Sequence, residues 1–293
     1  MKILVIFTGG TIGSTVSGDY ISTDGKKPYI ILEKYNKEFS NSIEWHTESP
    51  YTILSENATI DNYRMLAKSV KAGLQKNYDG IIVTHGSDTL QYSAAFLSLI
   101  LGDDVAPVML VSSNYVLEDE RANGMDNFEA AVDFITNHRG RGVFVPYKNV
   151  GENVKIHRGK LLMTHVTYSY YLYSVDDSYY EIESPYEEPD YSTKDMGVVV
   201  VHAMPGFIYP VLTKDVKAVL LQAYHGGTFC VEDDNFRAFI KMAKELMIPV
   251  YLVGANTETD YDSCKEYENL GIKVLKHLSP IYVYMRLWVS KWE

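Results

Sequence analysis

A threonine enclosed by glycines follows the first apolar run of the chain. The segment Thr8–Gly13 (TGGTIG) comes directly after Ile3–Phe7. Glycines at the end of a strand let the backbone turn sharply and approach a ligand closely. The glycine spacing does not match GxGxxG, and neither a basic residue nor GKS/T accompanies it, which disfavours a nucleotide-binding loop. Two interpretations remain: a plain tight turn, and a loop that presents the Thr11 hydroxyl as a nucleophile or ligand.

A second polar cluster, Thr84–Thr89 (THGSDT), follows another apolar run and precedes an amphipathic stretch. Ser87 and Asp88 stand where a helix N-cap is expected, so capping is one interpretation. The other is chemical, because a hydroxyl near a carboxylate can orient or deprotonate a nucleophile, or the acid can hold a substrate ammonium. Two such clusters at successive strand ends favour the chemical interpretation.

The elements that must position these clusters are short apolar runs alternating with helical patterns. Residues 60–74 and 128–135 repeat apolar side chains at the helical period. The runs that predict strands are Ile3–Phe7, Gly80–Thr84, Pro107–Ser112 and Gly142–Val145. This alternation predicts an α/β fold whose mainly parallel sheet has helices on both faces, a Rossmann-like arrangement. Such sheets bind ligands at the carboxyl ends of their strands, where the strand order reverses.

A second domain is predicted beyond a proline-containing, acidic stretch. We predict an N-terminal domain over residues 1–183, a linker over 184–197 and a smaller α/β domain over 198–293. The tyrosine-rich segment 168–180 is predicted to form a half-buried ribbon or hairpin. In the smaller domain the predicted strands are Val198–Val201, Ala218–Gln222 and Pro249–Val253, and the predicted helices are Asp234–Leu246 and Ser279–Val289.

Charge and composition narrow the class of protein. Lys plus Arg is 27 and Asp plus Glu is 38, which gives a net charge of −11 and disfavours nucleic acid or an anionic membrane as a partner. No apolar stretch approaches the roughly 18 residues of a membrane helix, and the N-terminus does not resemble a signal peptide. Cys230 and Cys264 lack metal-ligand spacing, as do the histidines. We therefore expect a cytoplasmic protein without a metal site.

The two polar clusters together resemble the signatures of the L-asparaginase/glutaminase family of amidohydrolases, its cytoplasmic type in particular. Residues 54–57 (LSEN) resemble the segment whose serine holds the substrate α-carboxylate, and 18–21 (GDYI) the mobile loop that carries a tyrosine. Residues 125–128 and 217–227 match further family segments. The resemblance covers most of the chain and is tightest over residues 1–135.

The resemblance implies a two-step hydrolysis of the asparagine side-chain amide through an acyl-enzyme, with no cofactor and within a homodimer or homotetramer. Thr11 would be the nucleophile, with Tyr20 near it, and Ser87 would keep the hydroxyl of the family's threonine. Asp88 would bind the substrate amino group and Ser55 its carboxylate. The full set of expected catalytic and substrate-binding residues is Gly10, Thr11, Tyr20, Ser55, Glu56, Gly86, Ser87 and Asp88.

One departure from the family pattern affects the chemistry. The family carries a relay lysine in a segment of the form Arg-Gly-x-Arg-x-x-Lys-x-His, whereas this chain has RGKLLMTH at 158–165, which puts Met163 in the lysine position. A thioether cannot shuttle protons. Three interpretations stay open: Lys160 or His165 replaces the lysine, the chain uses a modified chemistry or substrate, or it is an amino-acid-binding protein that lost turnover.

Glu56 is a second departure, because the family more often has a neutral residue there. A carboxylate in the pocket would repel an α-carboxylate or select a cationic ligand, whereas a solvated side chain would do neither. Glu258 and Tyr261 have no assigned role. The sequence thus predicts an asparaginase-like amidohydrolase acting on asparagine or a related small amide. The alternative is a catalytically impaired or non-catalytic homologue that binds an amino acid.

Overall fold

The computed structural model describes residues 1–17, 20–22, 29–39, 42–165, 169–175, 197–255 and 261–289. They fall into two compact units, the first holding residues 1–174 and the second holding Val175 and residues 197–289. Residues 184–196 of the predicted linker lie outside the described part, so the predicted domain boundary stays a prediction. No helix in the described ranges is both long and apolar enough to cross a membrane.

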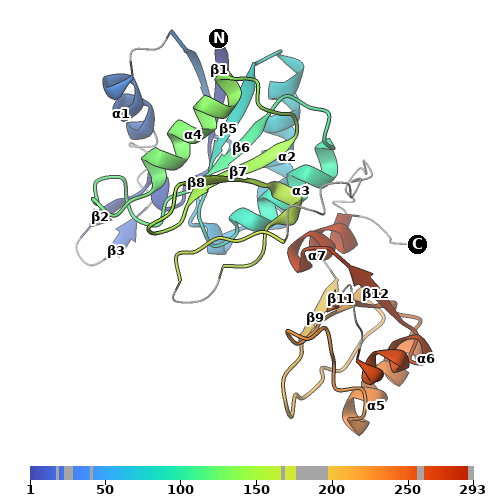
Figure 1. Cartoon of the computed structure of the whole chain (residues 1–293). Coiled ribbons are helices and arrows are strands. Elements are labelled where there is room, and N and C mark those ends of the chain that lie inside the picture. The colour runs from blue at the N-terminus through green and yellow to red at the C-terminus, as the bar shows by residue number, and fades with distance from the viewer. Residues whose placement is uncertain are drawn as a thin grey trace. The chain divides into compact units, whose positions relative to one another are not determined.

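The first unit is built on a six-stranded sheet with the order β4-β1-β5-β6-β7-β8 (Figure 1). The first five strands are parallel, and β8 joins the edge antiparallel to β7. The side chains of β1, β5 and β6 are buried nearly throughout, as expected for a parallel sheet covered on both faces. The strands are β1 (Lys2–Phe7), β4 (Glu44–Glu48), β5 (Gly80–Thr84), β6 (Val108–Val111), β7 (Val143–Lys148) and β8 (Val154–Arg158).

Four helices cover this sheet, two on each face (Figure 1). Alternate residues of β1 and β6 pack with side chains of α1 (Ile30–Glu38) and α4 (Gly124–Thr136) in one apolar cluster. Helices α2 (Ile60–Gln75) and α3 (Leu90–Leu101) pack against each other on the opposite face. The predicted fold class is therefore confirmed.

The strand order reverses direction between β1 and β5, which is where open α/β sheets generally bind ligands. The chain passes from β1 to β4 on one side, then crosses back to β5 on the other side of β1. The connections therefore diverge at the carboxyl ends of β1 and β5, which leaves a crevice where open α/β sheets bind ligands. Both polar clusters singled out in the sequence follow these two strands directly.

The second unit has a parallel sheet with the order β12-β11-β10-β9. The strands are β9 (Val198–His202), β10 (Ala218–Gln222), β11 (Val250–Ala255) and β12 (Ile272–Lys276), and the helices are α5 (Asp234–Glu245), α6 (Glu266–Asn269) and α7 (Pro280–Val289). Val219 and Leu221 pack toward α5, whereas Leu220 packs toward α7, so this sheet is also covered on both faces. Its three predicted strands and two predicted helices are all present.

Sequence reasoning missed five of the described strands, β2 (Thr15–Ser17), β3 (Tyr20–Ser22), β4, β8 and β12, and it also missed the helices α1 and α6. β4 (EWHTE) and β8 (VKIHR) are edge strands with partly exposed side chains, and they lack the continuous apolar run of the central strands. A strand at the edge of a sheet is less buried and therefore lacks such an apolar run, so the hydrophobic pattern of the sequence does not reveal edge strands.

Candidate functional site

Three loops meet at the carboxyl ends of β1 and β5. Residues 8–14 follow β1, 49–57 follow β4 and 85–89 follow β5. The first two are joined by backbone hydrogen bonds, since the N–H of Gly10 donates to the carbonyl of Ile53 at 2.9 Å. The Ile53 N–H donates in turn to a carbonyl of the first loop. The loops after β1 and β4 are thus paired through their backbones, next to the loop after β5.

Close backbone contact joins the two polar clusters, and glycine makes it possible. Gly10 has a φ of 76°, and a Cβ there would lie 2.4 Å from the backbone nitrogen and the Cα of Gly86. A Cβ on Gly86 would lie 2.4 Å from Oγ of Ser55. No side chain fits at either position. Thr11 follows Gly10 and Ser87 follows Gly86. The contact between the two glycines therefore holds the loops that carry Thr11 and Ser87 side by side.

The expected site residues differ in exposure in a way that suits a ligand. Ser55 is buried, Thr11 and Ser87 are half-buried, and Asp88 is exposed. Among the described residues, neither the Thr11 hydroxyl nor the Asp88 carboxylate has a hydrogen-bond or ion-pair partner. A hydroxyl and an acid at one crevice, both without such partners, can accept a small ligand that carries an ammonium group.

The capping interpretation of Ser87 and Asp88 is wrong. The N-cap of α3 is Thr89, and no side chain caps the helix. The Thr89 hydroxyl donates instead to the carbonyl of Ser55 at 3.1 Å, which ties the loop after β5 to the loop after β4. The side chains of Ser87 and Asp88 are thus left for another role, next to the positive end of the α3 dipole.

His85 supports the loop from inside the protein. Its Nδ1–H donates to the carbonyl of Gly86 at 2.8 Å, which leaves Nε2 to accept the hydroxyl proton of Ser93, also at 2.8 Å. The ring is buried, and this burial lowers the pKa of His85. Both ring nitrogens are used, so this histidine is a neutral structural element of the loop.

A small cavity of about 10 Å³ lies behind Ser55 and Gly86. That is room for about one water molecule. Polar side chains line much of it, among them the phenol of Tyr51, whose pKa is raised by burial despite a hydrogen bond with Thr8. The lining residues are Thr8, Tyr51, Ile53, Ser55, Ala58, Asn62, Tyr63, His85, Gly86 and Ser93. The cavity is too small to hold an amino acid.

Lys160 does not replace the family's relay lysine. Its ammonium is buried and pairs with Asp103 at 2.7 Å. Asp103 follows the carboxyl end of α3 and lies beside Gly142, the residue before β7. That position is the amino edge of the parallel strands, opposite the crevice. The structure therefore corrects the hypothesis that Lys160 takes over the proton relay.

Met163, which the sequence resemblance predicts to stand in the relay-lysine position, lies on a segment that returns to the carboxyl end of β7. We call residues 162–165 together with 169–174 the strap. Leu162 and Ser174 form an antiparallel bridge, and the Met163 N–H donates to the carbonyl of Tyr173 at 2.8 Å. The amide of Asn149, which follows β7, bonds both backbone groups of Leu172. The described part of the tyrosine-rich segment, residues 169–175, thus pairs with residues 162–163 through a single bridge and one further backbone hydrogen bond.

Two other expected site residues are exposed. Tyr20 lies on β3 (Tyr20–Ser22), which pairs with β2 (Thr15–Ser17), and it is 79% exposed. Its loop neighbours Gly18 and Asp19 lie outside the described residues, so a catalytic role for Tyr20 stays a prediction. Glu56 is also exposed, next to buried Ser55. Glu258 lies outside the described residues, and Tyr261 is exposed.

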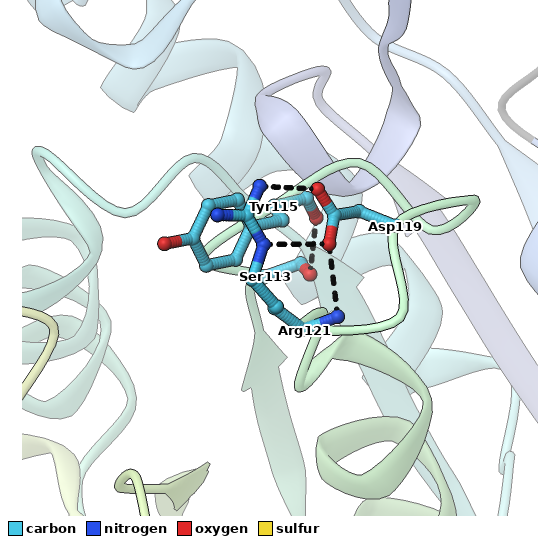
Figure 2. A network of polar contacts seen from close by, with 4 residues as sticks. All are labelled: Ser113, Tyr115, Asp119 and Arg121. Carbon is cyan, nitrogen blue, oxygen red and sulfur yellow. Dashed lines mark hydrogen bonds and ion pairs between the residues drawn. The ribbon is translucent and has the colours of Figure 1, made fainter.

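Sequence reasoning missed a network of polar contacts in the segment after β6, part of which Figure 2 shows. We call this segment, residues 113–121, the rim. The Arg121 guanidinium makes two hydrogen bonds with the Asp119 carboxylate, at 2.9 and 2.7 Å, and lies 4.1 Å from the centre of the Tyr115 ring. The Ser113 hydroxyl donates to the Tyr115 carbonyl. Hydrogen bonding from Arg121 lowers the pKa of Asp119 to about 2. The only available signal was an Asp and an Arg two residues apart, and it is too common to identify such a rim.

Tyr115 also connects this rim to the strap. Its ring lies 5.1 Å from that of Tyr170, and a side-chain hydrogen bond with Tyr170 raises the pKa of Tyr115. The hydroxyl of Tyr147, on β7, bonds Asn114 in the rim and the carbonyl of Tyr170 in the strap. Rim and strap are thus joined at the carboxyl ends of β6 and β7. No group of three potential metal ligands occurs among the described residues.

A family model described as the asparaginase N-terminal domain matches residues 2–168. L-asparaginase 1 of Escherichia coli K12 is 29% identical over 140 residues, which are 47% of this chain and 41% of that protein. One of the glutamyl-tRNA(Gln) amidotransferase subunits of Methanobrevibacter smithii is 32% identical over 134 residues, 44% of this chain and 30% of that protein. The chain therefore spans less than half the length of these curated relatives.

Solved structures extend the likeness of fold over the whole chain. The thermostable L-asparaginase of Thermococcus kodakarensis aligns with a TM-score of 0.72 at 19% identity, covering 98% of this chain and 92% of that one. A probable cytoplasmic L-asparaginase of Campylobacter jejuni aligns with a TM-score of 0.73 at 19% identity, covering 98% and 94%. At this identity the likeness concerns the fold alone.

Proposed function

The chain belongs to the asparaginase family, and from this premise we propose that it hydrolyses the side-chain amide of asparagine or a related small amide. The Thr11 oxygen would bond to the amide carbon, and the C–N bond would break to release ammonia. Water would then hydrolyse the resulting ester and free the acid. Relatives that are amidotransferase subunits extend the candidate substrates to glutamine.

The substrate's charged groups would be held by two of the three loops. Asp88, exposed and without an ion-pair partner among the described residues, would pair with the α-ammonium. The buried Ser55 hydroxyl and backbone N–H groups would bind the α-carboxylate. The positive end of α3 would favour the negative charge that develops on the amide oxygen. Each of these roles requires the loops to be in contact.

The observation that carries the proposal is the contact of Gly10, Gly86 and Ser55 at the crevice between β1 and β5. This contact between three separate segments supports a site that combines the Thr11 hydroxyl, the Asp88 carboxylate and Ser55. If the two loops were only tight turns, glycine would not be needed at both Gly10 and Gly86, where the loops touch. The packing supports a site that binds a small zwitterion.

Ammonia release from a panel of asparagine, glutamine and related amides tests the proposal. The wild-type chain should release ammonia, and Thr11→Ala should lower kcat by at least about 100-fold. Thr11→Ser keeps a hydroxyl and should retain part of the activity. A wild-type chain that releases no ammonia from any amide, or a fully active Thr11→Ala variant, contradicts the proposal.

A non-catalytic amino-acid-binding protein is the second candidate, and the placement of Lys160 and Met163 favours it. The lysine is engaged with Asp103, and a thioether occupies the relay position. Calorimetry separates the two candidates. Binding of asparagine without any ammonia release, weakened by Asp88→Asn, supports the binding protein.

A further inference from the structure

Gln91, in the first turn of α3, is a polar residue that is buried almost completely. Only 1% of its surface is exposed. Its side-chain Nε2 lies 3.1 Å from the carbonyl oxygen of Asp88, three residues earlier in the chain. A carbonyl only accepts hydrogen bonds, so the NH₂ half of the amide faces Asp88 and donates to it. The side chain therefore holds the main chain of the residue to which the proposed function assigns the substrate ammonium.

The other half of the same amide is left without a partner. Oε1 of Gln91 is buried, and within the described part of the chain it accepts no hydrogen bond. Most buried polar atoms in proteins are paired, because an unpaired one lowers the stability of the fold. A methionine of similar length would fill this position without an unpaired oxygen. Stability alone therefore does not account for a glutamine here.

Side chains at the start of α3 hold three different parts of the candidate site. The Thr89 hydroxyl bonds the carbonyl of Ser55, in the loop after β4, and the Ser93 hydroxyl bonds the ring of His85. Thr89 and Ser93 are four residues apart and therefore share one face of the helix. Gln91 lies two residues from each, which is more than half a turn away, and it holds Asp88 from another side.

The hydrogen bond from Gln91 restrains the direction in which the Asp88 side chain leaves the backbone. Asp88 is the residue before the N-cap Thr89, and its side chain is exposed. The backbone has two soft dihedral angles per residue, and fixing the carbonyl restrains one of them at Asp88. A carboxylate that is already held in place loses less conformational entropy when it pairs with an ammonium group. The amide of Gln91 can thus strengthen ammonium binding without touching the ligand.

We propose that Gln91 is a positioning residue for Asp88 and thereby sets the preference of the site for amides that carry an α-ammonium group, an inference that rests on the proposed function. The donor half of its amide holds the carbonyl of Asp88, and this hold accounts for a glutamine that leaves Oε1 unpaired. The site then favours amino-acid amides over the same amides without the amino group. Substrates without an ammonium do not depend on Asp88 and gain nothing from Gln91.

Ammonia release from asparagine and from succinamic acid, which is asparagine without its amino group, tests the inference. In Gln91→Met we expect kcat/KM for asparagine to fall about tenfold, mainly through KM, with kcat within about threefold of the wild type. For succinamic acid kcat/KM should stay within about twofold. Gln75→Met, at an exposed position of α2, is the control and should leave both values unchanged. Equal losses on the two substrates, or no loss on asparagine, overturn the inference.

Urea unfolding of the same variants needs no turnover and keeps the inference separable from the proposed function. Gln91→Met removes an unpaired buried oxygen, so its unfolding midpoint should equal or exceed that of the wild type. A wild-type chain without ammonia release contradicts the proposed function, and the midpoints then decide whether the fold requires the glutamine. A clearly lower midpoint in Gln91→Met than in Gln75→Met shows that the fold requires it and overturns the inference.

Discussion

At the scale of single residues, the candidate site depends on its glycines as much as on its hydroxyl groups. Thr11 and Ser87 carry the hydroxyls, but they share a crevice only because Gly10 and Gly86 touch through their backbones. Ser55 fills the remaining space beside Gly86. The two hydroxyl-bearing loops are thus held together by backbone contact, and a side chain on either glycine would push them apart.

Gly86→Ala tests this dependence. The added methyl would lie 2.4 Å from Oγ of Ser55, and relieving that overlap should cost about 1 to 3 kcal/mol of unfolding free energy. The displaced loop should also lower kcat/KM by about 100-fold. Urea unfolding and ammonia release measure the two effects. Gly13→Ala is the matched control, because a Cβ there meets nothing within 4 Å, and equal behaviour of the two variants would refute the packing argument.

At the scale of elements, the short turn after β8 anchors one end of the strap. This turn, Gly159–Leu161, packs on α3, where a Cβ on Gly159 would come within 2.9 Å of the Ala94 carbonyl. Lys160 fixes the same turn through Asp103. From this anchor the chain returns along the strap to the carboxyl edge of the sheet, where Asn149, which follows β7, bonds Leu172. Lys160, which the sequence analysis considered as a replacement for the relay lysine, is thus part of this anchor.

Lys160→Met separates anchoring from catalysis. The variant keeps most of the side-chain volume but loses a charge-assisted hydrogen bond to a half-exposed carboxylate, so the unfolding free energy should fall by about 1 to 2 kcal/mol. The pH profile and kcat of ammonia release should stay within about twofold of the wild type. A 100-fold loss of kcat in a folded Lys160→Met protein would restore Lys160 as the relay.

At the scale of the whole molecule, buried His85 and partly buried His165 make stability depend on pH. Burial lowers the pKa of His85 and of His165 in the folded chain. Between each lowered pKa and about 6.5 the unfolded chain therefore binds more protons than the folded chain. Their contribution to stability is complete above about pH 6.5 and is lost as the pH falls toward the folded pKa values.

Urea unfolding of the chain between pH 7.5 and pH 5 measures this loss. Each histidine should lower the unfolding free energy by up to about 1.4 kcal/mol per pH unit in that window. Asp119, whose pKa is lowered to about 2, changes the unfolding free energy only at pH values below this range, so it does not affect the measurement. A stability that is flat from pH 7.5 to pH 5 would contradict the assignment of both rings as neutral in the folded chain.

The sequence by itself determined the alternating strands and helices, the two glycine-bearing loops and the family, because buried parallel strands and tight turns leave local patterns in the residues. Edge strands such as β4 and β8 left none. Only the tertiary structure decided that Lys160 pairs with Asp103 and that Ser87 and Asp88 do not cap α3. These depend on contacts between segments far apart in the chain, which no local spacing encodes.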